Sequence, residues 1–233
     1  MKKKATEVLG YFGGYFLGIF TGTISYLRRS RIFHSRGEVF SARVLSLRSE
    51  IIKFHPYSTV RFSSALWKNG EGQDVFGIAI RFSDQKGFSL IPRNKDQDLL
   101  FATFDSTWKI LFSPFITQQD DYFANEYFAI SPFKTKTLQN VYFKLIPKGP
   151  KVLGKSRKEK LINTIETGSS SLLLYMKEEK EEWRKFAEIV LEEKIDIDQE
   201  TMRFDPFLAG LQINPIGFVH YLRIGSYKMS QWF

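Results

Sequence analysis

The sequence predicts an α+β fold in which antiparallel β-strands form the body of the protein and a helix lies near each end of the chain. Between residues 37 and 150, short runs of β-branched, aromatic and aliphatic residues are bounded by Gly, Pro, Asn and Asp, a pattern typical of strands joined by turns. Residues 8–27 form a charge-free run of helical length, and Pro215 stands near the expected start of a C-terminal helix. Several short strands at close spacing favour an antiparallel barrel or a sandwich.

Composition limits the kinds of protein that this chain can be. At 233 residues it can bury one large core or two small ones. Its 23 phenylalanines and 16% aromatic content favour a large β core or a pocket for a flat apolar ligand. The chain has no cysteine, which excludes disulfides, zinc–thiolate sites, iron–sulfur clusters and a thiol nucleophile.

The positive charge is concentrated near the N-terminus. Residues 1–43 hold eight Lys or Arg against two Glu, a net charge of +6, and the rest of the chain holds about +3. A nucleic-acid-binding protein usually spreads its cations over a folded surface, so no nucleic-acid partner is expected. Cations on either side of an apolar run indicate contact with a membrane or with a buried anion.

The run 8–27 has the length that a helix needs to cross the hydrocarbon core of a bilayer. Four glycines spaced four apart form one stripe suited to close helix contact: Gly10, Gly14, Gly18 and Gly22. We expect 1–30 to be an apolar helix that contacts or anchors in a membrane, and 31–233 to be the folded domain. The alternative is a helix that packs on that domain of a cytoplasmic protein. A cleavable signal peptide is not expected, because Arg28 follows the run and no small-x-small site does.

Six runs in the middle of the chain are expected to form strands. They are EVFSARVLSL (38–47), STVRFSSALW (58–67), DVFGIAIRF (74–82), DLLFATF (98–104), WKILFSPF (108–115) and NVYFKLIP (140–147). Residues 120–129 are expected to form a short helix between strands, and 148–160 a basic surface connector. SSSLLLYM (169–176) is expected to be a strand, and 177–194 shows the pattern of an amphipathic helix.

His34 is one of three histidines, and it lies among fixed cations: Arg28, Arg29, Arg31 and Arg36. Imidazole is the side chain best suited to moving protons near neutral pH. Guanidinium groups at this density bind phosphate, carboxylate or acidic lipid. The simpler interpretation is a basic flank at the end of a membrane segment, with no role for His34.

Sequence motifs farther along the chain favour a functional role for His34. They are Arg31-x-x-His34-x-x-Gly37, Val60-Arg61-Phe62-Ser63, Asp-Val-x-Gly-Ile-Ala-Ile-Arg-Phe at 74–82, and Arg223-x-x-x-Tyr227 with Pro215, Gly217 and Ser230 around it. In order and spacing these motifs resemble the catalase superfamily, and its small catalase-like haem proteins most of all. The resemblance covers 31–233. It implies an antiparallel β-barrel with an N-terminal arm, a C-terminal helix on the proximal side of the cofactor, and haem b as that cofactor.

The resemblance assigns the proximal residues to the C-terminal helix. Tyr227 would ligate the haem iron as a phenolate. A phenol must lose its proton to do so, and Arg223, one helical turn earlier, would favour the anion.

The resemblance assigns the distal residues to the N-terminal arm and the second strand. His34 would be the distal acid–base, with Ser63 near its ring. The guanidinium groups of Arg31 and Arg61 would neutralise the haem propionates. The N-terminal cations would then pair with a buried anion.

The sequence departs from the family pattern in the distal residues and at its C-terminal end. Family members have an asparagine after the Asp-Leu-x-x strand, where its amide orients peroxide, but here Asp98-Leu-Leu-Phe is followed by Ala102 and Thr103. The family also has an arginine seven residues beyond the proximal tyrosine, and this sequence ends at Phe233, one residue short of it. The resemblance aligns 183–194 with a strand, against the helical pattern of that stretch.

The expected function is haem-dependent reduction of hydrogen peroxide or of organic and lipid hydroperoxides. Loss of the distal amide should weaken disproportionation of hydrogen peroxide more than general peroxidation. The alternative is a non-enzymatic, membrane-associated β-barrel protein that binds haem or lipid without turnover.

Overall fold

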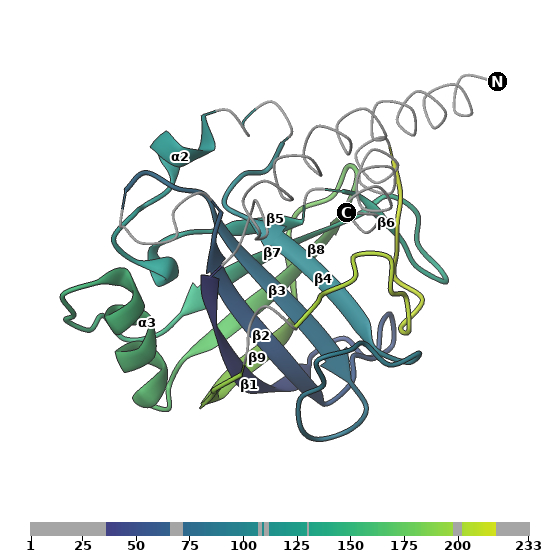
Figure 1. The fold of residues 1–233 in the computed structure, drawn as a ribbon. Helices are drawn as coiled ribbons and strands as arrows, with labels where there is room; N and C mark the ends of the chain where they lie inside the picture. Colours follow the sequence, from purple (N-terminus) through teal and green to yellow (C-terminus); the bar gives the residue numbers. More distant parts are fainter. Residues whose placement is uncertain are drawn as a thin grey trace, which may run out of the picture.

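The computed structural model describes residues 36–65, 72–106, 109, 112–129, 131–197 and 202–217 (Figure 1). The apolar run at 8–27 lies outside these residues, as do Arg31, His34, Arg223 and Tyr227, so what the sequence predicts for them stays a prediction. Among the described residues, no helix combines the length and the apolar character that crossing a bilayer requires.

Eight antiparallel strands of the described chain close into a β-barrel (Figure 1). They are β1 (Arg36–Ser46), β2 (Tyr57–Ser64), β3 (Phe76–Ser83), β4 (Gln97–Ala102), β5 (Tyr127–Ala129), β7 (Val141–Lys148), β8 (Ser171–Glu178) and β9 (Arg184–Ile195). Their order around the barrel is β7-β5-β4-β3-β2-β1-β9-β8, and pairing of β7 with β8 closes the ring. Two short strands, β6 (Phe133–Lys134) and β10 (Asn214–Pro215), extend the sheet beside β7. The predicted antiparallel barrel is confirmed.

Alternation of side chains along the strands produces the core. On β1, Phe40, Ala42 and Val44 are buried in one apolar cluster, and on β2 Val60 and Phe62 belong to the same cluster. Because all eight barrel strands contribute to this cluster, it marks the interior of the barrel. The residues between these positions therefore point outward.

The predicted strand at 108–115 is wrong where the structure describes it. Residues Ser113–Ile116 form the short helix α2. Pro114 explains the difference, because proline cannot donate to a strand ladder but fits the first turn of a helix. The predicted helix at 120–129 is partly right, since Tyr122–Ala124 form a 3₁₀ turn, η2, and the chain then enters β5.

The amphipathic helix that the pattern predicts at 177–194 is also wrong. Most of this stretch is β9, as the family resemblance implied. Lys and Glu have high helix propensity, but β9 pairs with β1 on one edge and β8 on the other, and it buries Phe186, Ile189 and Leu191 in the core. Pairing on both edges outweighs local propensity.

A helix that the sequence analysis did not predict, α3 (Arg157–Glu166), follows the first part of the basic connector. Its N-cap is Ser156, whose hydroxyl accepts a hydrogen bond from the Glu159 amide at 3.1 Å. The Glu159 carboxylate accepts in turn from the Lys155 amide at 2.8 Å. This Ser-x-x-Glu spacing is a capping box, a sequence signal that predicts a helix start.

The segment 202–217 crosses the outside of β3 and β4 (Figure 1). Pro215, expected near a helix start, lies in β10 and pairs with Phe133 of β6. The amide of Ile216 then donates to the carbonyl of Pro132 at 2.8 Å.

Candidate functional site

The register of β1 to β4 brings one small residue from each of three sequence motifs, Gly37, Ser63 and Gly77, onto the outer face of the barrel. Gly37 of β1 pairs with Ser63 of β2, Ser63 with Gly77 of β3, and Gly77 with Ala102 of β4. Residues paired directly across antiparallel strands project to the same face. This row is therefore composed of four small residues.

Arg61 lies in the next row of the same face. It pairs with Val39 of β1 and Ala79 of β3, and Ala79 pairs with Leu100 of β4. We call the group formed by Gly37, Arg61, Ser63, Gly77 and Ala102 the outer-face cluster.

Four members of the outer-face cluster are buried although they lie on the outside of the barrel, and Gly37 is half-buried. Arg61 is 5% exposed, Ser63 4% and Ala102 6%. The Ser63 hydroxyl donates to the Gly77 carbonyl at 3.3 Å, which ties the two small residues together. Burial of an arginine requires an anion or several hydrogen-bond acceptors around its guanidinium group.

Glycine is required at position 37 by a close approach of β1 to β2. A Cβ atom there would lie 2.2 Å from the Phe62 carbonyl oxygen and 3.2 Å from Nε of Arg61. Any larger residue would push against the backbone of β2 and the guanidinium group of Arg61. Gly37 is the last residue of the Arg-x-x-His-x-x-Gly motif, and this close contact explains why that position is a glycine.

Strand register shows which of the two residues after Asp98-Leu-Leu-Phe, Ala102 or Thr103, lies on the outer face of the barrel. Ala102 is the member of the β4 strand that lies in the row of Ser63. The Thr103 hydroxyl instead accepts from the Phe76 amide at 3.3 Å and lies 2.8 Å from the Thr117 hydroxyl. The side chain that β4 contributes to the outer-face cluster is thus a methyl group, which carries no hydrogen-bond donor.

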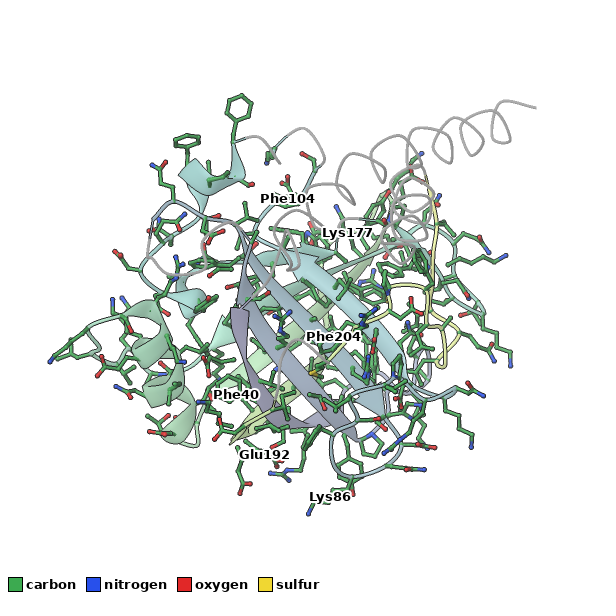
Figure 2. All side chains as sticks on the ribbon, viewed as in Figure 1. Phe40, Lys86, Phe104, Lys177, Glu192 and Phe204 are labelled. Carbon is green, nitrogen blue, oxygen red and sulfur yellow. The ribbon has the colours of Figure 1, made fainter. Side chains whose placement is uncertain are left out.

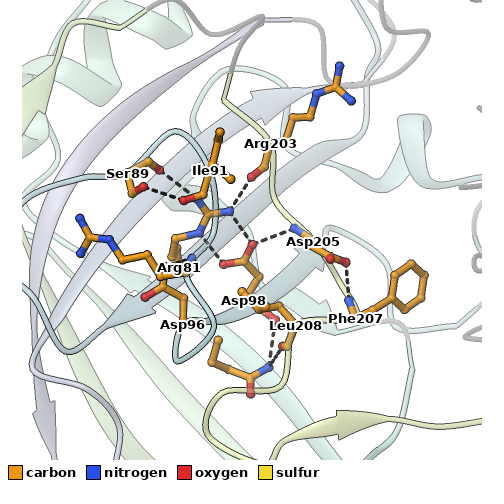
Figure 3. A network of polar contacts seen from close by, with 11 residues as sticks. Arg81, Ser89, Ile91, Asp96, Asp98, Arg203, Asp205, Phe207 and Leu208 are labelled. Carbon is orange, nitrogen blue, oxygen red and sulfur yellow. Dashed lines mark hydrogen bonds and ion pairs between the residues drawn. The ribbon is translucent and has the colours of Figure 1, made fainter. Parts of the chain in front are cut away.

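A third row of the same face holds an ion pair that sequence reasoning missed. Arg81 of β3 pairs in register with Asp98 of β4 and donates to it twice, at 2.8 and 2.7 Å (Figure 3). Both side chains are almost fully buried. Burial raises the pKa of the Asp98 carboxyl, and the bonds from Arg81 and the Asp205 amide oppose that rise. The sequence shows one charged residue in each of these two predicted strands, Arg81 and Asp98. Only the strand register shows that the two residues lie opposite each other.

This ion pair fastens the segment 202–217 to the barrel. Arg81 also donates to the carbonyls of Ser89 and Arg203, and the Asp205 amide donates to Asp98 at 2.7 Å (Figure 3). The ring of Phe204 lies over the Arg81 guanidinium, 5.0 Å from its carbon. We call this group the Arg81–Asp98 clasp.

The other end of the small-residue row is aromatic and cationic. Ala102 pairs with Phe128 of β5, and Phe128 pairs with Lys144 of β7. The Lys144 ammonium group lies 5.3 Å from the ring centre of Trp183 and 5.6 Å from that of Tyr175. These cation–π contacts and an ion pair with Glu126 at 3.2 Å hold the Lys144 ammonium group beside Phe128, where the Glu126 carboxylate balances its charge.

Two of the residues that the resemblance assigns to a haem site lie in the outer-face cluster. Arg61 carries a buried guanidinium group, the kind of cation that pairs with a carboxylate, and Ser63 lies in the next row. Within the described residues, no three His, Asp or Glu side chains gather into a group that would ligate a metal ion. The predicted iron ligand and distal base lie outside those residues, and the structure brings together Arg61 and Ser63 of the six predicted site residues.

Comparison of the chain with models of known protein families finds no match, and comparison with curated proteins finds no similar sequence.

Proposed function

We propose that this protein is a haem-dependent hydroperoxidase built on a catalase-like barrel. The observation that carries the proposal is the outer-face cluster. Residues from three separate motif segments, Gly37, Arg61 with Ser63, and Gly77, lie in adjacent rows of one face. Such convergence is expected if the motifs serve one site.

Each residue has a definite task in this proposal. Arg61, together with Arg31, binds the haem propionates, and Tyr227 is the iron ligand with Arg223 favouring its phenolate form. When bound, haem b supplies the iron centre at which a peroxide O–O bond is cleaved. His34 takes the proton from one peroxide oxygen and returns it to the oxygen that leaves, and Ser63 orients its ring. General acid–base transfer of this kind contributes about 10²–10⁴-fold to the rate.

The residue at position 102 supports organic hydroperoxides as substrates. Reduction of such a substrate to an alcohol and water consumes two protons and two electrons from an organic donor. The methyl group of Ala102 cannot donate a hydrogen bond to a second hydrogen peroxide molecule, and it leaves space for an alkyl substituent. A lipid hydroperoxide delivered from the membrane by 8–27 fits both features.

The same residue favours a second candidate function. A membrane-associated barrel protein that lacks the distal amide would bind haem or lipid without catalysing any reaction of peroxide. This candidate differs from the first in a single measurable property, the reaction with peroxide.

The test begins with full-length protein purified with haem supplied. The expected result is a ferric spectrum with phenolate character, followed by consumption of an organic hydroperoxide in the presence of an electron donor. Tyr227→Phe should remove the phenolate character, whereas Tyr142→Phe, on the outer side of β7, should leave the spectrum unchanged.

Two results would decide against the proposal. If no stoichiometric haem is bound, the cofactor is wrong. If haem is bound and no hydroperoxide reacts, the second candidate function is correct.

A further inference from the structure

The helix α2 and Phe112, the residue before it, present three apolar side chains to solvent at one end of the barrel. Phe112 is 65% exposed, Phe115 69% and Ile116 55%. We call these residues the apolar tip. Single exposed apolar residues are ordinary, but a group of adjacent ones marks an interaction surface.

The apolar tip stands on a rigid, hydrogen-bonded base. The Thr117 hydroxyl donates to the Ser113 carbonyl at 2.7 Å, and the Gln119 side chain donates to the Pro114 carbonyl at 2.7 Å. Ser113 and Thr117 are buried. Since polar groups of the base are bonded inward, the apolar side chains are held outward, which lowers the entropic cost of inserting them into a partner.

A basic surface lies at the same end. The exposed residues Lys148, Lys151 and Lys155 belong to the connector that precedes α3, and Leu153 between them is 92% exposed. Asp74 links this connector to the tip. Its backbone exchanges hydrogen bonds with the Gln119 side chain beneath α2, and its carboxylate lies 3.6 Å from Arg157 at the start of α3.

The N-terminal part of the chain joins the barrel at this end as well. β1 begins at Arg36, which pairs with Ser64, and Ser64 pairs with Phe76 at the start of β3. Phe76 in turn donates to Thr103, which contacts Thr117 below the apolar tip. Lys158 of α3 also pairs with Glu38 of β1, so the first described residues of β1 lie beside α3 at this end.

From these placements we infer that the α2–α3 end of the barrel docks on an anionic membrane surface. The apolar tip and Leu153 enter the head-group region, and the lysines of the connector contact acidic lipid. Apolar insertion combined with basic residues is the chemistry of peripheral membrane binding. The inference concerns how the domain is oriented and does not depend on haem binding.

The opposite end of the barrel provides matched controls. β3 runs from Phe76 beside Asp74 to Ser83, so the β3–β4 loop lies at the far end from α2 (Figure 1). This loop carries Ile91, which is 76% exposed, and two exposed lysines, Lys86 and Lys95. Figure 2 labels Lys86 at that end and Phe104 near α2.

Because the chain has no cysteine, one fluorophore can be attached at a single introduced position in the full-length protein. Phe115→Cys and, as control, Ile91→Cys are labelled and mixed with phosphatidylcholine vesicles that contain about one-third phosphatidylglycerol. The label at 115 should shift to the blue and be quenched by a lipid-borne quencher, while the label at 91 stays in water. Lys151→Glu with Lys155→Glu should weaken this response at least about tenfold, since each basic residue near an anionic surface contributes several-fold. Lys86→Glu with Lys95→Glu should leave it unchanged.

Three outcomes would overturn the inference. Vesicle-bound protein whose 115 label stays in water would show that only another segment contacts the membrane. A response at 91 and none at 115 would reverse the orientation. A blue shift that depends on protein concentration and needs no vesicles would assign the apolar tip to contact between copies of this chain.

Discussion

The outer-face cluster depends on residues whose importance is visible only through pairing. Gly37, Ser63, Gly77 and Ala102 lie far apart in sequence, and each is unremarkable by itself. The motif resemblance singled out Gly37, Arg61 and Ser63, but the sequence left open whether Ala102 or Thr103 faced the same site. Strand register decides, because a shift of one residue moves a side chain to the opposite face.

Arg61 is expected to contribute to cofactor affinity. Arg61→Gln should weaken haem binding about tenfold or more, because a charge-assisted contact to a carboxylate is worth more than a neutral one. Haem titration followed by absorbance measures the change. Arg43→Gln is the control, since Arg43 is an exposed arginine of β1 that pairs with Glu192. Equal affinities for wild type and Arg61→Gln would exclude a propionate contact.

Restoring the amide should change the choice of peroxide. Ala102→Asn is expected to raise oxygen evolution from hydrogen peroxide relative to organic peroxidation by several-fold, because it supplies the missing donor on the cluster. The ratio of oxygen released to donor oxidised is the measurement. Thr103→Asn should instead lower thermal stability without altering that ratio, because Thr103 bonds to the Phe76 amide and to Thr117. An unchanged ratio in Ala102→Asn would refute the specificity argument.

At the scale of elements, the Arg81–Asp98 clasp joins two strands and the segment 202–217 at one point. The segment also contacts the start of β4, where the side-chain amide of Gln97 donates to the Leu208 carbonyl at 2.7 Å. A Cβ atom on Gly210 would lie 2.0 Å from the Lys95 carbonyl oxygen, so this crossing requires glycine. The clasp therefore fixes the path of the chain towards its C-terminal part.

Breaking one side of the clasp should be costly. Arg81→Met leaves a buried carboxylate without its cation and should reduce the free energy of unfolding by roughly 3–5 kcal/mol. Replacing both partners, Arg81→Met with Asp98→Leu, should recover much of that loss. Urea unfolding measures all three proteins. Lys109→Ala, which removes an exposed pair with Asp105, should cost about 0–1 kcal/mol. A double variant as unstable as the single one would contradict the charge argument.

The sequence predicts a strand correctly where the residue pattern within the run is itself typical of a strand. It fails where pairing with neighbouring strands determines the structure. Runs at 38–47, 58–67, 74–82 and 98–104 alternate or stay apolar between turn residues, and each overlaps a barrel strand to within one or two residues at its start. The stretch 177–194 has the composition of a helix, and only its position between β1 and β8 makes it a strand. The start of α3, in contrast, was readable from Ser156 and Glu159, a capping box within a connector expected to be irregular.

At the scale of the whole molecule, the barrel and the apolar run 8–27 should be separable. Deleting Met1–Thr23 is expected to release the protein into the soluble fraction with its haem content retained. A charge-free run of this length is costly to expose, at roughly 25 cal/mol per Å² of apolar surface, and it is better accommodated in lipid. Fractionation and haem content of both forms are the measurements. Soluble full-length protein together with an aggregated, haem-free truncation would instead mean that the run packs on the barrel.

The pairing of β1 with β9 has a consequence for synthesis. Ser41 and Glu193 exchange hydrogen bonds across this seam, although 152 residues separate them in the chain. At ribosomal rates of about 5–20 residues per second, the β9-facing edge of β1 stays unpaired for roughly 8–30 s after β1 is made. An open strand edge with alternating apolar residues is a template for pairing with another nascent chain. The yield of native protein should therefore rise when the expression level is low or chaperones are abundant, because fewer neighbouring chains then meet this edge before β9 covers it.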